Sequence, residues 1–290
     1  MSAPLTGTTH TVRGIVLIIA AVSTFAIMDT TAKYLSRTYP VPAIVWARYF
    51  TQTLIMLVVL GPRLGLDLLR TRRPDLQLAR GITLALATLL FFSALSLMPI
   101  AEASALNFVS PLLLTALSVL LLRERVAPAA WLAVAAGFAG VLVIIRPGGG
   151  VFSPAALLPL GTACCFAAYQ IMTRQLAGVD SSFTTLFYSA IVGTALMSLV
   201  VPFFWHPPET VVHGLLLAML GVLGAVGHFV LIRAFHHAAA SVLAPFVYSQ
   251  LVAALILGYA VFGDFPDGWS LVGMAIIVAS GVFVALRNRA

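Results

Sequence analysis

The chain has 290 residues, of which 61% are hydrophobic and only 9% charged, and its mean hydropathy is +1.07. Soluble domains carry about 25% charged residues, so this composition excludes an ordinary soluble protein and indicates an integral membrane protein. The apolar runs are continuous and helix-length, which favours membrane helices over the alternating pattern of a β-barrel.

Ten apolar segments are predicted to cross the membrane, because each holds about the 20 residues that a helix needs to span a bilayer core. They are the segments 13–35, 42–61, 78–98, 101–122, 126–146, 153–177, 183–205, 211–236, 239–262 and 268–287. The first segment is too long for a signal peptide, and neither a basic leader nor an A-x-A cleavage site accompanies it. We therefore expect it to stay in the chain as a membrane helix.

The net charge is +7, and the placement of the basic residues along the chain predicts a membrane orientation and not a nucleic-acid partner. If the N-terminus is cytoplasmic, Lys33, Arg37 and Arg146 lie outside and Arg48 lies within a helix, while the other basic residues lie inside. Those inside are Arg13, Arg63, Arg70, Arg72, Arg73, Arg80, Arg123, Arg125, Arg174, Arg233, Arg287 and Arg289. This bias predicts a multi-pass protein of a bacterial inner membrane with both termini in the cytoplasm.

An internal repeat divides the chain into two units, 1–147 and 151–290. The run 103–106 (Ala-Ser-Ala-Leu) recurs as 240–243 (Ala-Ser-Val-Leu), and Trp269 stands where Trp131 stood. Each unit holds five predicted helices, and since five is odd, the second unit must enter the membrane from the opposite side. Such inverted repeats place a binding site between the halves near the midplane and allow alternating access.

Several motifs of this all-α membrane chain resemble those of the EamA-type ten-helix carriers of the drug/metabolite transporter superfamily. The resemblance rests on the duplicated five-helix unit, Arg48 within Trp-Ala-Arg-Tyr-Phe (46–50), Pro111, and Leu-Arg-Glu-Arg at 122–125. The chain departs from the family pattern at Arg123, where glycine is usual, at Tyr248, where a proline would match Pro111, and at Asp264, which replaces a displaced glutamate. Gly-His-Phe at 227–229 and Phe-Gly-Asp at 262–264 resemble the group that includes proposed riboflavin carriers. The resemblance implies transport of a small metabolite.

Asp29 and Arg48 are the first candidates for a substrate site, because charged residues inside a membrane are costly and often functional. Both lie about six residues from the outer ends of adjacent predicted helices, or roughly 9 Å deep. We expect them to form an ion pair, with Lys33 one turn from Asp29. In one interpretation Arg48 holds an anionic or polar substrate group and Asp29 sets its charge or takes a proton. In the other, the pair only neutralises two buried charges.

His228, deep in the eighth predicted helix, is a candidate for substrate contact or charge switching, although it could equally bond a neighbouring helix. Gly221, Gly224 and Gly227 on the same helix are predicted to permit close helix packing, and could also leave room for a flat ligand. Proton coupling through Asp29 or His228 and simple facilitated exchange both remain open, as do import and export.

Polar and aromatic residues of other helices complete the predicted pocket. The repeat maps Asp29 onto Gln170 and Arg48 onto Tyr188 or Ser189, according to the offset used. Apolar walls with a few placed polar groups suit an amphipathic or aromatic metabolite, either riboflavin-like or amino-acid-like. The further candidates are Phe25, Trp46, Phe91, Asn107, Tyr169, Gln170, Tyr188, Tyr248 and Gln250.

Other functions fit the sequence less well. A channel should show rings of like charge or filter segments, and a membrane-embedded enzyme should show a catalytic motif, and neither pattern is present. A channel or lipid scramblase nevertheless remains the main alternative. We expect no cofactor, no metal and no catalytic residue, with a small-molecule substrate and the lipid bilayer as partners and a monomer or homodimer as the assembly.

Overall fold

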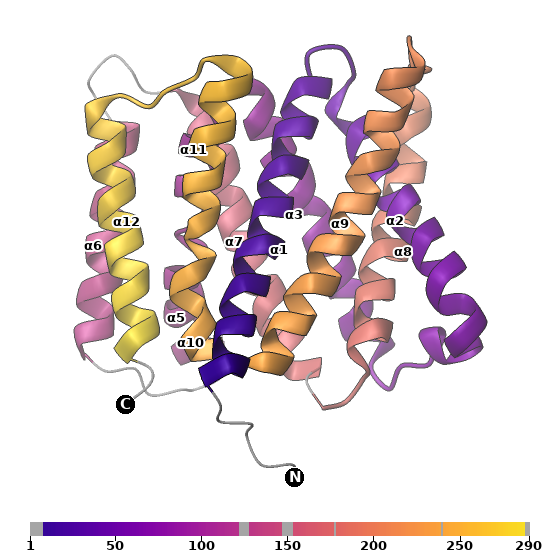
Figure 1. The fold of residues 1–290 in the computed structure, drawn as a ribbon, viewed down its shortest axis with the longest axis horizontal. Helices are drawn as coiled ribbons and strands as arrows, with labels where there is room; N and C mark the ends of the chain where they lie inside the picture. Colours follow the sequence, from indigo (N-terminus) through magenta and orange to yellow (C-terminus); the bar gives the residue numbers. More distant parts are fainter. Residues whose placement is uncertain (1–7, 122–127, 147–152, 177, 239, 288–290) are drawn as a thin grey trace.

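The computed structural model describes residues 8–121, 128–146, 153–176, 178–238 and 240–287, and over these ranges it is helical throughout, without a strand (Figure 1). Short 3-10 turns, η1 (Gly65–Leu69), η2 (Pro154–Ala156) and η3 (Val201–Phe203), lie beside the longer helices. The α-helices are α1 (Thr8–Leu35), α2 (Val41–Leu64), α3 (Pro74–Leu97), α4 (Ile100–Asn107), α5 (Ser110–Leu121), α6 (Pro128–Ile145), α7 (Leu157–Leu176), α8 (Ser182–Val200), α9 (Val211–His237), α10 (Ala240–Val247), α11 (Ser249–Phe262) and α12 (Gly268–Arg287).

Each of the ten predicted segments is mainly helical where the structure describes it. Eight stretches are long and apolar enough to cross a membrane, and the shorter apolar helices 131–145 and 268–283 accompany them in the described part of the chain. α12 has the predicted bounds, whereas α3 begins four residues earlier than expected, at Pro74. Proline suits the first turn of a helix, where its missing N–H needs no partner. This earlier start places Arg80 about one turn further from the helix end than expected.

Two of the predicted helices are broken in the middle. The segment 101–122 divides into α4 and α5 around Phe108, and the segment 239–262 divides into α10 and α11 at Tyr248. Pro111, in the first turn of α5, cannot donate the backbone hydrogen bond to Asn107 that a continuous helix requires. Pro245 lies within α10, three residues before the second break. The expectation of uninterrupted helices here is therefore wrong.

Helices of the two halves interleave along the bundle. α1 packs against α9 and α11, α2 against α8 and α9, α3 against α7 and α8, and α6 against α12. Figure 1 shows α1 and α9 side by side near the centre and the α6–α12 pair at one end. α1 begins and α12 ends at the same edge, called the lower edge below, and the opposite edge is called the upper edge. Any site at the centre of the bundle is therefore built from both halves.

Glycines bring some of these helices into backbone contact. A Cβ at Gly221 of α9 would lie 2.5 Å from Thr51 Cβ, 2.6 Å from Gln52 N and 2.8 Å from Arg48 O of α2. A Cβ at Gly227 would lie 2.5 Å from a ring carbon of Phe25 on α1. The predicted packing role of these glycines is confirmed. α9 thus fits closely against both α1 and α2, and carries His228 to the centre of the bundle.

Candidate functional site

Arg48 is buried in the bundle, with 4% of its surface exposed. Its Nε donates to Met28 Sδ at 3.4 Å, a weak acceptor, and its Nη1 to Thr88 Oγ1 at 3.4 Å, a long hydrogen bond to a neutral acceptor. The guanidinium also lies over the ring of Tyr49, 4.6 Å from its centroid. Within the described residues no carboxylate lies at ion-pair distance from Arg48. The cation is thus held in place but not neutralised by direct pairing.

The expected Asp29–Arg48 ion pair is not formed. Asp29, 3% exposed, accepts a hydrogen bond from Gln250 Nε2 of α11 at 3.3 Å. Successive residues of a helix point about 100° apart, so Met28 faces Arg48 while Asp29 faces α11. Asp29 still interacts electrostatically with Arg48 at longer range. The structure therefore brings three predicted site residues, Asp29, Arg48 and Gln250, into one region, with a different pairing.

Lys33 also has a different partner from the one expected. Its Nζ lies 2.7 Å from Asp264 Oδ2 and donates to Met98 O at 2.9 Å, instead of pairing with Asp29 one turn below. Asp264 follows α11 at the upper edge, so the ion pair joins the two halves of the chain there. A second upper-edge pair joins Arg146 to Asp267, and the Arg146 hydrogen bond, with that of the Ser270 backbone N–H, lowers the pKa of Asp267 to about 2.

Arg80, one of the basic residues expected at the cytoplasmic side, is a second buried guanidinium. It is 4% exposed, and its Nε donates to Thr173 Oγ1 at 2.7 Å, its Nη1 to Thr185 O at 2.9 Å and to Ser189 Oγ, and its Nη2 to Tyr169 OH. These partners lie on α7 and α8, in the other half of the chain. Pro74 is the signal in the sequence, since a helix that starts there makes Arg80 its seventh residue.

The two guanidinium groups belong to one polar region. His228 interacts electrostatically with both Arg48 and Arg80, and Tyr49 interacts with both Arg80 and Tyr169. Tyr49 OH forms a hydrogen bond of 2.8 Å with Thr88 Oγ1, the same hydroxyl that accepts a hydrogen bond from Arg48 Nη1. Two cations therefore share the centre of the bundle with a single buried carboxylate, Asp29, within the described residues.

Aromatic rings lie next to this polar region. Phe25 and His228 meet edge to face with centroids 5.0 Å apart, and the Tyr169 and Phe166 rings stack at 5.5 Å. Phe91 is 9% exposed and belongs to the hydrophobic cluster that contains Met28 and Tyr49. Phe25 thus lies beside His228, and Phe91 lies in the cluster that surrounds Met28 and Tyr49.

Unpartnered polar atoms lie around the two helix breaks. Tyr248 stands at the α10–α11 break, and its ring packs on Phe108 at the α4–α5 break with centroids 5.0 Å apart. Tyr248 OH, Asn107 Oδ1 and Ser104 Oγ are buried without a hydrogen-bond partner in the described structure. Gln52 Oε1, close to Gly224 and to Arg48, is a fourth such atom. Buried polar atoms without partners are costly, so they are available to a polar ligand.

Three predicted site residues lie elsewhere. Trp46 stacks on Phe50 at 4.8 Å and donates to Ser198 Oγ at 2.9 Å on the α8 side of α2. Tyr188 donates to Leu69 O at 2.9 Å near the lower edge, and Gln170 is half-buried on α7. Ser189, the alternative symmetry mate of Arg48, is one of the residues that accept a hydrogen bond from Arg80.

Polar contacts also join the halves at the lower edge. Asp180, between α7 and α8, accepts from Gln77 Nε2 at 2.8 Å, from the backbone N–H of Arg72 at 3.1 Å and from the Thr71 hydroxyl. Although partial burial opposes ionisation, these hydrogen bonds lower the pKa of Asp180 below its usual value. Upper and lower edges are thus each joined by charged contacts between the halves, with the polar region between them.

Comparison with known proteins gives consistent matches. The model of the EamA-like transporter family matches residues 12–146 and again residues 153–286. The S-adenosylmethionine uptake transporter of Rickettsia prowazekii is 30% identical, and the riboflavin transporter of Vibrio cholerae 33% identical, each over 95% of this chain and 93% of the relative. A pseudopaline exporter of Pseudomonas aeruginosa is 30% identical over 95% of this chain and 97% of its own. One solved crystal structure shares the fold, with a TM-score of 0.64 and 23% identity over 97% of this chain and 99% of that chain.

Proposed function

The chain belongs to the EamA-like transporter family, a multi-pass membrane family of the drug/metabolite transporter superfamily, and we propose that it carries an amphipathic or aromatic metabolite by alternating access. Membership indicates a transporter of small molecules and not an enzyme. The finer proposal concerns the substrate, the route and the residues that bind it.

The proposed architecture is ten membrane crossings in two inverted repeats, 1–147 and 151–290. The family matches both halves separately, which supports the duplication. The repeat pairs α1 with α7, α2 with α8, α3 with α9 and α6 with α12. Under this exchange the α1–α9 contact becomes α7–α3, and the α2–α9 contact becomes α8–α3. Both of these contacts are present in the structure. A pseudo-two-fold relation of this kind is expected of an inverted repeat.

The observation that carries the substrate proposal is the buried, unpaired guanidinium of Arg48. A cation in the interior of a membrane protein is costly unless something neutralises it, and among the described residues Arg48 donates only to a thioether and a hydroxyl, each at 3.4 Å. An anionic or acceptor-rich substrate group would bind there, because arginine forms strong charge-assisted hydrogen bonds. Arg80 on α3, in the same half, and His228 on α9, in the second half, would face the same group.

Aromatic and amphipathic substrates fit the surroundings of Arg48. Phe25, Phe91, Tyr169 and His228 offer ring faces and edges, and Gln250, Asn107 and Tyr248 offer polar atoms at the helix breaks. A flavin-like ring system or an amino-acid-like head would use both kinds of contact. The relatives' names, which mention riboflavin, S-adenosylmethionine and pseudopaline, agree with an amphipathic metabolite.

Alternating access would make and break the charged contacts at the two edges in turn. The upper edge is joined by Lys33–Asp264 and Arg146–Asp267, and the lower edge by the hydrogen bonds of Asp180. In the proposed orientation the lower edge faces the cytoplasm of a bacterial inner membrane, because most of the basic residues would then be inside. Both termini would be cytoplasmic.

A ligand-dependent thermal-shift screen tests this proposal. Detergent-purified protein is screened with flavins, amino acids, nucleosides and S-adenosylmethionine, in wild type and in Arg48→Ala. A ligand at 100 times its Kd adds about 2.7 kcal/mol of apparent stability, and Tm should rise with the logarithm of the ligand concentration. We expect a hit that Arg48→Ala loses and that Arg63→Ala, a change at an exposed arginine of the same helix, retains. A hit that Arg48→Ala retains in full would refute the assignment.

A further inference from the structure

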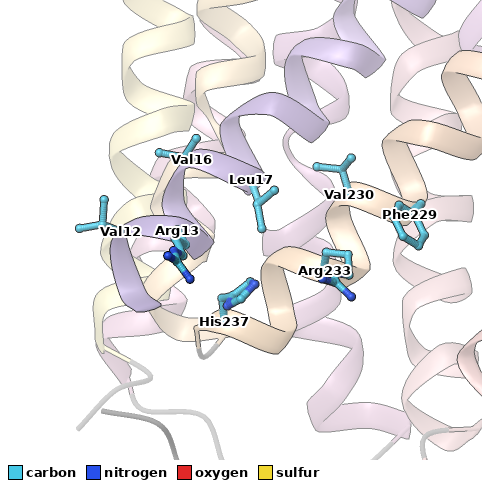
Figure 2. Close-up of a pocket in the computed structure, with 8 residues that line it drawn as sticks. All are labelled: Val12, Arg13, Val16, Leu17, Phe229, Val230, Arg233 and His237. Carbon is cyan, nitrogen blue, oxygen red and sulfur yellow. The ribbon is translucent and has the colours of Figure 1, made fainter. Parts of the chain in front are cut away.

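A hollow lies outside the candidate site, between the first turns of α1 and the last turns of α9 (Figure 2). Its volume is about 550 Å³. The residues that line it are Val12, Arg13, Val16, Leu17, Phe229, Val230, Arg233 and His237. None of them belongs to the proposed substrate site, so the hollow needs its own explanation.

On both helices that line the hollow, a basic residue lies nearer the helix end than an apolar residue on the same face. Figure 2 shows the basic side chains of Arg13 and Arg233 toward the helix ends, and Val16 and Val230 further along the helices. Val16 follows Arg13 by three residues and Val230 precedes Arg233 by three, so on each helix an apolar residue lies one turn deeper on the same face. A turn advances about 5.4 Å, which is the change from headgroup level to the start of the acyl region.

The hollow opens toward the lipid and is closed toward the interior. Val12, Val16 and Phe229 are 57%, 60% and 51% exposed, whereas the α1–α9 crossing behind them is tight. A Cβ at Gly14 would lie 2.8 Å from Ala238 Cβ, and Ala234 is fully buried. A ligand would therefore enter sideways from the membrane and would not pass to Arg48.

The two arginines at the opening of the hollow are complementary to an anion. Arg13 and Arg233 are both exposed, and within the described part of the chain neither forms an ion pair with a carboxylate. Two like charges beside an apolar cleft are complementary to a molecule with a negative head and an aliphatic tail. A free phosphate would satisfy the two arginines but would leave the apolar wall uncovered.

We propose that this hollow binds an anionic phospholipid of the leaflet at the lower edge, with the phosphate between Arg13 and Arg233 and an acyl chain along Val16, Val230 and Phe229. Basic pockets between membrane helices are suited to such headgroups. Because α1 and α9 also carry Asp29 and His228, a lipid held here clamps together two helices that build the candidate substrate site.

The test compares lipids that differ only in headgroup charge. Full-length protein in a neutral detergent is titrated with phosphatidylglycerol, with phosphatidylcholine of the same acyl chains, and with inorganic phosphate. Retained lipid is measured by native mass spectrometry and stability by Tm. We expect phosphatidylglycerol to be retained preferentially and to raise Tm. Arg13→Gln or Arg233→Gln should each weaken its binding about five-fold, whereas Arg63→Gln, at an exposed arginine outside the hollow, should leave it unchanged.

Two further variants keep the proposal refutable if a glutamine variant folds poorly. Arg13→Lys should retain the preference for phosphatidylglycerol, because the charge remains. Val16→Glu, at an exposed position, should weaken binding by placing a carboxylate beside the phosphate. Equal retention of the two lipids, an Arg63→Gln effect as large as that of Arg13→Gln, or a full Tm shift with inorganic phosphate alone would each overturn the proposal.

Discussion

Replacing Gly221 by alanine tests the close α2–α9 contact that positions Arg48. The new Cβ would lie 2.5 Å from Thr51 Cβ, 2.6 Å from Gln52 N and 2.8 Å from Arg48 O. Two of these three atoms belong to the backbone of α2, so no side-chain rotation can relieve the overlap. The two helices must instead move apart by about 1 Å to reach ordinary contact distances.

The expected loss of stability combines two opposing effects. Overpacking of this kind costs about 1–3 kcal/mol, while replacing glycine by alanine within a helix gains up to about 1 kcal/mol. Gly214, on the same helix, provides the matched control, because a Cβ there would meet only Pro208 at 3.6 Å. We therefore expect Gly221→Ala to be less stable than Gly214→Ala by about 1–3 kcal/mol.

Thermal unfolding of the two variants in the same detergent measures this difference in stability. The affinity of each variant for the ligand identified by the binding screen measures the effect of the substitution on the site. Gly221→Ala should melt several degrees below Gly214→Ala and bind the ligand more weakly, because Arg48 moves with α2. Equal melting temperatures together with unchanged ligand affinity would refute the close contact.

Three further changes test other contacts. Arg80→Met should alter stability by less than about 2 kcal/mol, since it removes a costly buried charge and leaves the Ser189 and Thr173 hydroxyls bonded to backbone carbonyls, but should weaken ligand binding at least about ten-fold; unchanged affinity would contradict this. Asp264→Asn should cost about 0.2–1 kcal/mol, less at high salt, and a Tm equal to wild type at low salt would be the opposing result. Asp180→Asn should lower Tm by a constant amount above about pH 5, and the difference should vanish as the pH falls through the lowered pKa of Asp180, because only the ionised carboxylate stabilises the fold; a difference that grows in acid would contradict the reasoning.

The positions of the helices could be predicted from the sequence, because long apolar runs in a membrane protein admit few alternatives. The burial of Asp29 and Arg48 was predictable for the same reason. Their partners were not, because they come from distant parts of the chain: Asp264 reaches Lys33 across 231 residues and Gln250 reaches Asp29 across 221. Sequence spacing within one helix carries no information on such contacts.

Arg80 and the helix breaks show two further limits. Arg80 follows a run of cytoplasmic arginines, so charge counting placed it outside the membrane, although Pro74 marks an earlier helix start. Hydrophobicity likewise runs without interruption through Tyr248, where the helix breaks. Both features depend on where the backbone hydrogen bonding of a helix begins or is interrupted, which apolar periodicity does not record.

Counterflow in proteoliposomes tests the central claim most directly, namely that the chain is an alternating-access carrier whose site includes Arg48. Vesicles preloaded with the unlabelled ligand found in the binding screen are diluted into a trace of labelled ligand. A carrier should accumulate label transiently above its equilibrium level, and Arg48→Ala should abolish this accumulation while Arg63→Ala retains it. Flux that does not saturate and ignores preloading, or counterflow that survives in Arg48→Ala, would contradict the account.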